Sequence, residues 1–148
     1  MKNHDNDPFQ LHRFITAQEN IYDNVLQELR NGKKQSHWMW FIFPQIEGLA
    51  QSTTSNYYAI KSIQEAEHYL NHPILGMRLI ECSELVLVVE GKSISQIFGH
   101  PDDIKFKSCM TLFACVEGSN SLFIKVLDKY FNGEQDSKTI ALLKHTVL

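Results

Sequence analysis

The residues of this chain that could take part in chemistry concentrate in two stretches, residues 36–45 and residues 98–113. In the second stretch, Pro101 is expected to open a helix whose first turn carries Asp102 and Asp103. A carboxylate there could act as a general base or accept a hydrogen bond from a sugar hydroxyl. The alternative is that both acids only interact with the helix dipole, which favours negative charge at a helix N-terminus. Because they are adjacent, they point about 100° apart on a helix and do not form a paired dyad.

The same predicted helix carries Lys105, Ser108 and Thr111 among large apolar residues. Either hydroxyl can return a hydrogen bond to the carbonyl four residues back, which is common in helices. Alternatively, both hydroxyls line a cavity together with Lys105, which would meet a phosphate group. Arg78, on a different predicted helix, suits a two-point contact with an anion, although such an arginine commonly ties one helix to its neighbour.

Two tryptophans, Trp38 and Trp40, follow His37 in the first stretch. Core packing accounts for both indole rings, provided that each buried N–H finds a partner. In a functional interpretation, one ring is a stacking platform for a base or a nicotinamide-like ring, because every such ring has a π-face. Lys33 and Lys34 would then neutralise phosphate charge; alternatively they are a basic pair on a solvated loop. Histidine side chains titrate near neutral pH, which makes His37 a further candidate for the site.

We expect the two stretches to meet in the folded chain, because a helical domain can bring distant segments around one cavity. The predicted site residues are His37, Trp38, Trp40, Arg78, Asp102, Asp103, Lys105, Ser108 and Thr111. This hypothesis makes the protein a binder of a nucleotide or ADP-ribose-like small molecule, with hydrolysis as an extension that uses Asp102 or Asp103. The alternative is a protein-interaction module without catalytic activity, in which loops 44–57 or 91–101 contact a partner.

Helices must position these residues, because the apolar pattern is helical along nearly the whole chain. We predict one all-α domain, a compact bundle of about seven or eight helices, several of them short. Capping signals precede three of the helices, at Asp7–Pro8, Ser62–Glu65 and Ser93–Gln96. The predicted segments are 8–30, 37–43, 52–60, Ser62 to the His72–Pro73 break, 73–89, a single turn from Ser93 to Gly99, His100 or Asp102 to about 116, 120–131, and a last helix capped by Asp136.

Length and composition are those of an ordinary globular protein. The 148 residues suit a single domain over residues 1–148 with residues 1–7 frayed, and 43% of them are hydrophobic and 21% charged. The net charge of -3 differs from the one-sided basic footprint of nucleic-acid-binding proteins, so nucleic acid is not expected as a partner. No apolar run approaches ~18 residues and no signal segment is visible, so we expect no membrane span and a cytoplasmic location. The sequence leaves the oligomeric state open.

Cysteines and histidines offer little for metal or redox chemistry. Cys82, Cys109 and Cys115 show no CxxC spacing and lie in apolar segments, so we expect buried free thiols. His68 and His72 stand four residues apart, as two helical metal ligands would, but a proline breaks the helix there, and no metal site is expected. The sequence contains no P-loop, GxGxxG or GxSxG motif, so no cofactor is expected.

Four stretches closely resemble the bacterial domain-of-unknown-function family 1810: SHWMWFIFPQ at 36–45, YAI at 58–60, HPILGMRL at 72–79 and FGHPDDIKFKSCMTLF at 98–113. The resemblance covers Phe9 to about Leu143 in order. It implies a small, mainly α-helical, single-domain cytoplasmic protein and implies no activity. Family members are sometimes labelled calpastatin, but calpain inhibitors are disordered repeats, whereas this chain has a globular pattern. A more distant likeness, in size and helical content alone, is to the NADAR family, which is linked to ADP-ribose chemistry; it is an analogy.

Overall fold

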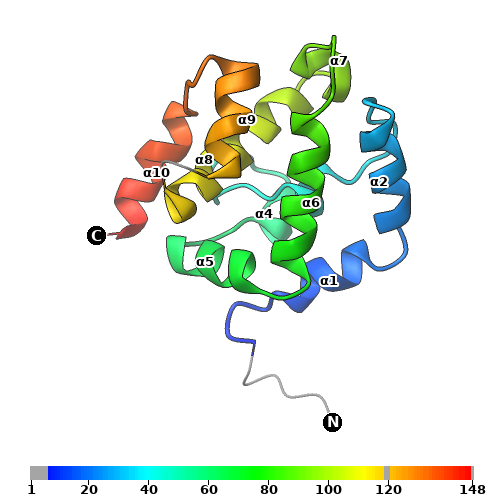
Figure 1. Cartoon of the computed structure of the whole chain (residues 1–148). Helices are drawn as coiled ribbons and strands as arrows, with labels where there is room; N and C mark the ends of the chain where they lie inside the picture. Colours follow the sequence, from blue (N-terminus) through cyan, green and yellow to red (C-terminus); the bar gives the residue numbers. More distant parts are fainter. Residues whose placement is uncertain (1–6, 119–120, 148) are drawn as a thin grey trace.

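The computed structural model describes residues 7–118 and 121–147. Within these ranges the chain forms ten α-helices and no β-strand (Figure 1), which confirms the all-α prediction but exceeds the predicted seven or eight helices. None of these helices is long and apolar enough to cross a membrane. The helices are α1 (His12–Gln18), α2 (Tyr22–Arg30), α3 (Met39–Ile42), α4 (Thr53–Tyr58), α5 (Ile63–Asn71), α6 (Leu75–Leu87), α7 (Ile94–Phe98), α8 (Asp102–Glu117), α9 (Leu122–Phe131) and α10 (Ser137–Val147).

The predicted first helix, residues 8–30, is wrong as a single element, because the structure divides it into α1 and α2. The break falls at residues 19–21, where Ile21 leaves the helical region with φ of -123°. Hydrophobic periodicity does not reveal this break, since Phe14 of α1 and Val25 of α2 are both fully buried in the same core. The apolar spacing therefore continues across a change of helix axis.

The chain also enters α1 later than the Asp7–Pro8 pair predicts. The Asp7 carboxylate accepts hydrogen bonds from the backbone N–H groups of Leu11 and His12, at 2.7 and 3.1 Å. These bonds close a turn over residues 8–11 before the helix begins. Asp7 thus satisfies free backbone donors as a cap does, but it lies five residues before His12, the first residue of the helix.

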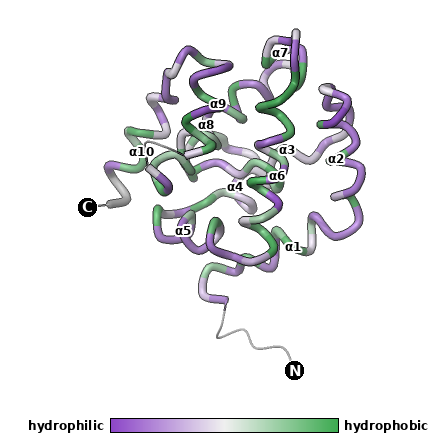
Figure 2. Tube along the Cα trace, viewed as in Figure 1, coloured by the Kyte–Doolittle hydropathy of each residue, from purple (hydrophilic) through white to green (hydrophobic). Residues whose placement is uncertain are grey.

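Helix α8 forms the centre of the molecule and contacts α5, α7, α9 and α10. Its fully buried apolar side chains are Phe106, Cys109, Met110, Leu112 and Phe113. Helix α6 packs against α2, α5 and α9. Hydrophobic segments recur along α6, α8 and α9, whereas α2 at the edge of the molecule is largely hydrophilic (Figure 2). The buried apolar residues therefore form one continuous cluster around α8. This packing holds α8 in place.

The connection between α5 and α6 is unusually tight. A Cβ atom on Gly76 would lie 1.9 Å from the carbonyl oxygen of Leu70, so only glycine fits there. Nδ1 of His72 accepts hydrogen bonds from the N–H groups of Ile74 and Leu75, at 3.1 and 3.2 Å. His72 therefore caps α6, which begins at Leu75 rather than at the predicted residue 73.

Of the predicted capping boxes, the one at α7 is complete and the one at α5 is half formed. The Ser93 hydroxyl accepts from the N–H of Gln96 while the Gln96 side chain accepts from the N–H of Ser93, a complete capping box. Ser62 likewise accepts from the N–H of Glu65 at 3.1 Å. The Glu65 side chain instead accepts from the N–H of Lys61, so that one carboxylate oxygen is left for a second partner.

The thiol prediction is correct for two cysteines and wrong for the third. Cys82 and Cys109 are buried free thiols, and burial raises the pKa of Cys82 to about 12 and that of Cys109 well above its usual value. Cys115 is exposed although its neighbours Ala114 and Val116 pack in or against the core. The two buried thiols therefore stay protonated at neutral pH and behave as small apolar side chains.

Candidate functional site

The N-terminal turn of α8 holds one carboxylate between two ammonium groups. Oδ2 of Asp102 lies 2.8 Å from Nζ of Lys34, and Oδ1 lies 3.2 Å from Nζ of Lys105. The side chain of Lys34 is only 7% exposed, and its backbone N–H donates to the carbonyl of Ile97 at 2.8 Å. Burial by itself would raise the pKa of Asp102, but the hydrogen bonds and charges of the two lysines lower it below its ordinary value. Asp102 is therefore a firmly ionised group that positions both lysines.

Trp38 lies next to this cluster but is a core residue. It is 2% exposed and packs against Phe43 and Phe98. Its indole N–H donates to Oε1 of Glu28 at 2.9 Å, and Nζ of Lys34 lies 5.2 Å from the centroid of its ring. A ligand cannot stack on this ring without opening the core.

Trp40 occupies a different position, half-buried at the surface of the same region. Nζ of Lys105 lies 4.1 Å from the centroid of the Trp40 ring, a close cation–π contact. The same tryptophan forms one wall of a pocket. The other lining residues are Gln45, Ile46, Gly48, Leu49, Ala50, Ser55, Tyr58 and Ala59. Of the two tryptophans, Trp40 is thus the one that combines a nearby cation with open space.

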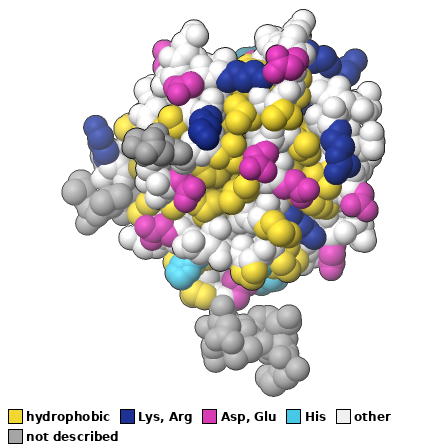
Figure 3. Space-filling view, in the orientation of Figure 1, with side chains coloured by type: hydrophobic (Ala, Val, Ile, Leu, Met, Phe, Trp, Pro, Cys, Tyr) yellow, Lys and Arg dark blue, Asp and Glu magenta, His cyan; other side chains and the backbone are white. Residues whose placement is uncertain are grey.

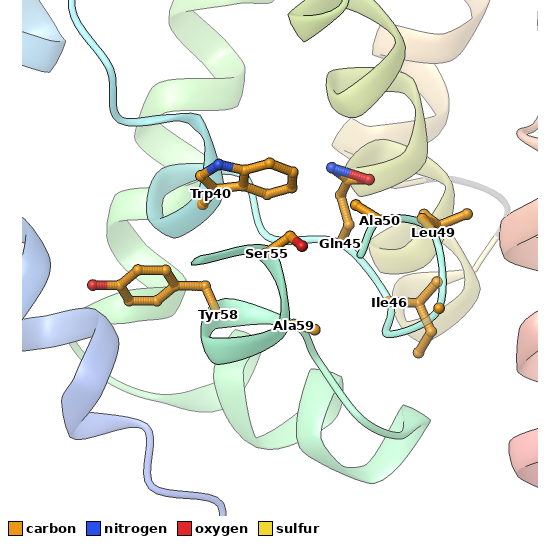
Figure 4. A pocket seen from close by; sticks show the side chains of 9 residues that line it. Trp40, Gln45, Ile46, Leu49, Ala50, Ser55, Tyr58 and Ala59 are labelled. Atoms are coloured by element: carbon orange, nitrogen blue, oxygen red, sulfur yellow. The ribbon is translucent and has the colours of Figure 1, made fainter. Parts of the chain in front are cut away.

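Gln45 is the most unusual residue of the pocket. It is 8% exposed, and its backbone is held in place because its carbonyl accepts from the N–H of Ile60 at 2.8 Å. Among the described residues neither its carboxamide nor the indole N–H of Trp40 has a hydrogen-bond partner. Figure 4 shows the Trp40 indole and the Gln45 carboxamide along the same side of the pocket, with the Ser55 hydroxyl facing the gap between them.

The pocket is small. Its open volume is only about 10 Å³, about enough for one water molecule. Gly48, Leu49 and Ala50 belong to the loop that joins Ile46 to α4 and lines the pocket. A Cβ atom on Gly48, whose φ is +107°, would lie 3.1 Å from a methyl carbon of Leu142, so the loop packs closely under α10. Pockets for whole small molecules measure roughly 300–1,000 Å³, so this loop must move to admit one.

Arg78 does not join the tryptophan–lysine cluster, which corrects the predicted convergence. Its guanidinium lies 4.6 Å from the centroid of the Tyr22 ring, and Nη1 donates to Oε1 of Gln18 at 3.1 Å. The other end of Gln18 donates to the carbonyl of Phe41 at 2.8 Å. Arg78 therefore ties α6 to α1 and α2, the structural alternative for such an arginine.

The two hydroxyls of α8 also take their structural alternative. Ser108 donates to the carbonyl of Ile104 at 3.2 Å, and Thr111 donates to the carbonyl of Lys107 at 2.8 Å. Thr111 additionally accepts from the N–H of Asp136 at 2.9 Å, which anchors the start of α10. Neither residue lines the Trp40 pocket.

Asp103 and His37 lie outside the pocket as well. Asp103 is 3.1 Å from Nδ1 of His100 and accepts from the N–H of Ile104 at 2.8 Å, so it closes the first turn of α8. His37 is exposed on the loop before Trp38 and is not among the pocket residues. Of the predicted site residues, the structure brings together Trp38, Trp40, Asp102 and Lys105.

Sequence reasoning missed Gln45 and gave Lys34 a different role. Gln45 follows Pro44 within an otherwise apolar segment. A polar residue at a position expected in the core can indicate a functional side chain. The sequence leaves Lys34 either beside a phosphate or on a solvated loop, whereas the structure gives it an internal ion pair with Asp102. The pairing could not be read from the sequence, because the two residues are far apart in the chain and on separate elements.

A second hollow, with a volume of about 510 Å³, lies beside Arg13 and Tyr57. Arg13 is only 7% exposed, and its three guanidinium nitrogens donate to four backbone carbonyls and to Oε2 of Glu65. No N–H group in this fork remains for an anion. This hollow is larger than the Trp40 pocket, but its central cation is already committed to the fold.

The fold and the site define a small all-α domain with an aromatic pocket edged by lysine. The chain belongs to the family described as "Protein of unknown function (DUF1810)", whose model matches residues 8–143. It is also similar to the crystal structure of the conserved hypothetical protein Rv1873 from Mycobacterium tuberculosis, with 51% sequence identity and a TM-score of 0.91. That match covers 93% of this chain and 99% of the mycobacterial chain. A comparison with curated proteins finds no match.

Proposed function

We propose that this protein binds a small molecule that combines a flat ring with a negatively charged group, such as a nucleotide or an ADP-ribose-like compound. The observation that carries the proposal is the Lys105 ammonium, 4.1 Å from the ring centroid of Trp40, beside the pocket that Trp40 lines. In this site Lys105 meets a phosphate and Trp40 contacts the ring. Asp102 holds the Lys105 ammonium in place through an ion pair at 3.2 Å.

The size of the pocket limits how such a ligand can sit. Its open volume of about 10 Å³ holds about one water molecule, so even a single ring can enter only when the lining loop moves. The phosphates therefore lie outside, where Lys105 is 22% exposed. Loops that line binding sites commonly rearrange on binding, and residues 47–51 are the segment that would open here.

Binding is better supported than hydrolysis. A general base must be free to take a proton from water, and its conjugate acid should have a pKa near the working pH. Asp102 is held by two ammonium groups that lower its pKa, and Asp103 is engaged with His100 and the backbone of α8. We therefore assign Asp102 a positioning role and propose no hydrolytic step.

The proposal is tested by thermal unfolding with ADP-ribose, NAD, AMP and ATP. A ligand that binds only the folded state at 100 times its Kd stabilises by about 2.7 kcal/mol, which is readily measured. The shift should disappear in Lys105→Met and persist in Lys107→Met. Lys107 is a matched control, because it lies on the same helix, pairs with Glu134 and lies 5.7 Å from the Phe131 ring. No shift with any of these compounds would overturn the proposal.

A protein-interaction module is the second candidate, and the outer face of α6 favours it. Ile74, Met77 and Ile80 follow one another at helical spacing and are 39%, 61% and 36% exposed. Figure 3 shows hydrophobic side chains gathered on the side of the molecule where α6 lies. Sedimentation of the wild type and of Met77→Lys tests this candidate. A concentration-dependent dimer that Met77→Lys abolishes would support it, and a monomer at every concentration would exclude self-association through this face.

We also propose a cytoplasmic location, and the cysteines support it. Cys82, Cys109 and Cys115 are free, and thiols stay reduced in the cytosol but tend to be oxidised in secreted proteins. Cell fractionation followed by immunoblotting tests this assignment, with recovery in the soluble cytosolic fraction as the expected result.

A further inference from the structure

The carboxamide of Gln45 has no hydrogen-bond partner among the described residues, although the residue is only 8% exposed. Its two amide atoms still reach solvent, since the fully buried side-chain atom without a partner in the described ranges is the hydroxyl oxygen of Ser83. Its backbone is pinned on both sides, since Pro44 precedes it and its carbonyl accepts from Ile60. The side chain is therefore held at the wall of the Trp40 pocket with its donor and acceptor unused.

The ordinary explanation for such a group is a single ordered water. The open volume of about 10 Å³ is close to the minimum that one water requires. A water here would donate to the carboxamide oxygen of Gln45 or accept from its NH₂ group. A ligand gains affinity by replacing such a water only if it makes the same hydrogen bonds. The donor and the acceptor of the Gln45 carboxamide therefore specify the complementary groups that the ligand must carry.

We propose that Gln45 selects the ligand by pairing with a planar ring that carries a donor and an acceptor side by side, the edge of an amide or of a nucleobase. This inference rests on the proposed function and specifies its ligand. A carboxamide presents one N–H donor and one oxygen acceptor in the same plane, so it forms two parallel hydrogen bonds with such an edge. The pocket walls contributed by Ile46, Leu49 and Ala59 are apolar and suit the rest of the ring.

A matched pair of small compounds isolates this hydrogen-bond pattern. Nicotinamide carries a carboxamide, and 3-acetylpyridine has nearly the same shape but a methyl group in place of the amide NH₂. A second pair is adenine, which has adjacent donor and acceptor atoms on one edge, and purine, which lacks the amino donor. Wild-type protein should bind at least one donor-bearing compound about tenfold more tightly than its partner, as expected for a two-point contact.

Binding is followed by the indole N–H signals in ¹H–¹⁵N NMR spectra, assigned with Trp40→Phe. The Trp40 signal should move on titration, while the Trp38 signal, whose N–H donates to Glu28, should stay in place. Gln45→Met keeps the side-chain volume and removes the paired donor and acceptor, so it should bind both members of a pair equally. Gln45→Leu is the second variant, in case the first folds poorly, and Lys105→Met should retain the preference.

Each result decides the matter. Equal binding of both members of each pair by the wild type, or a preference that survives in both Gln45 variants, would overturn the inference. If ADP-ribose binds through Lys105 but no ring compound is distinguished, the proposed function stands and this inference fails. If the ring compounds are distinguished but phosphate groups add no affinity, the inference stands and the phosphate role of Lys105 fails. Failure of every compound to bind the wild type would overturn both.

Discussion

The indole N–H of Trp38 donates to Oε1 of Glu28 at 2.9 Å, and the same carboxylate accepts from the backbone N–H groups of Gln35 and Ser36 and from the Ser36 hydroxyl. One buried carboxylate thus accepts from three residues of the segment that leads from α2 to α3. Trp40, two residues further on, has no such acceptor among the described residues and lines the pocket instead. The two tryptophans therefore differ in role, and this difference can be measured.

Trp38→Ala should destabilise the protein by about 3–5 kcal/mol, because it removes a large buried side chain and one donor to Glu28. Trp40→Ala should cost less than about 2 kcal/mol, since its ring is only half-buried. Urea unfolding at pH 7 measures both. Equal costs for the two variants would contradict this division of roles.

Glu28 should make stability depend on pH in the acid range. Burial by itself would raise the pKa of Glu28, but the hydrogen bonds from Ser36, Gln35 and Trp38 lower it to about 2, against an ordinary 4.5. A carboxyl group whose pKa is lower in the folded state stabilises the protein above its unfolded pKa. That contribution, on the order of 3 kcal/mol, is lost as the pH falls through 4.5 towards 2.

Glu28→Gln should therefore be less stable than the wild type at pH 7, and its free energy of unfolding should fall less between pH 5 and pH 2. Glu47→Gln is the control, because Glu47 is 48% exposed and its pairing with Lys61 is long at 3.8 Å. Unfolding curves in urea at several pH values supply the comparison. A wild-type pH profile retained by Glu28→Gln would show that other acids cause it.

The Arg13–Glu65 ion pair should be essential to the fold. Its two side chains are 7% and 3% exposed and meet at 2.7 Å, and removing one partner of a buried pair leaves an uncompensated charge. Arg13→Met should cost about 3–5 kcal/mol, whereas Arg30→Met, on the exposed side of α2, should change stability by less than about 0.5 kcal/mol. The double variant Arg13→Met with Glu65→Gln should cost less than the sum of the two single changes, because the two residues interact.

The elements that the sequence predicted well are those with local signals. Ser93 and Gln96 form a capping box within four residues, and Pro44 follows the short helix α3, so these features are visible without knowledge of the packing. The break between α1 and α2 has no such signal, since Gln18 is buried at the end of α1 by partners far along the chain. Breaks of this kind depend on long-range contacts and are invisible to periodicity.

The candidate site was predictable only in part, for a related reason. Residue types identified Trp40 and Lys105 as chemically capable, and the fold brings them within 4.1 Å of each other. Arg78 faces α1 and α2 and not the pocket. The rotation of α6 about its axis decides this, and no local sequence pattern encodes that rotation. Gln45 is significant only because its carboxamide lacks a partner, a property of the packed structure and not of the sequence.

Ser83 provides the last prediction, because its hydroxyl oxygen is buried without a partner in the part of the chain that the structure describes. The residue lies in α6 and is 0% exposed. A buried polar group that lacks a hydrogen bond costs roughly 1–3 kcal/mol, and alanine also has a higher helix propensity than serine. Ser83→Ala should therefore stabilise the protein by about 1 kcal/mol, which for a domain of this size raises Tm by roughly 4 °C. Ser108→Ala is the matched control: it is also a buried helical serine, but its hydroxyl donates to the Ile104 carbonyl, so its removal should stabilise less or destabilise. A lower Tm for Ser83→Ala than for the wild type would mean that the hydroxyl does have a partner, and an ordered water would be the group to look for.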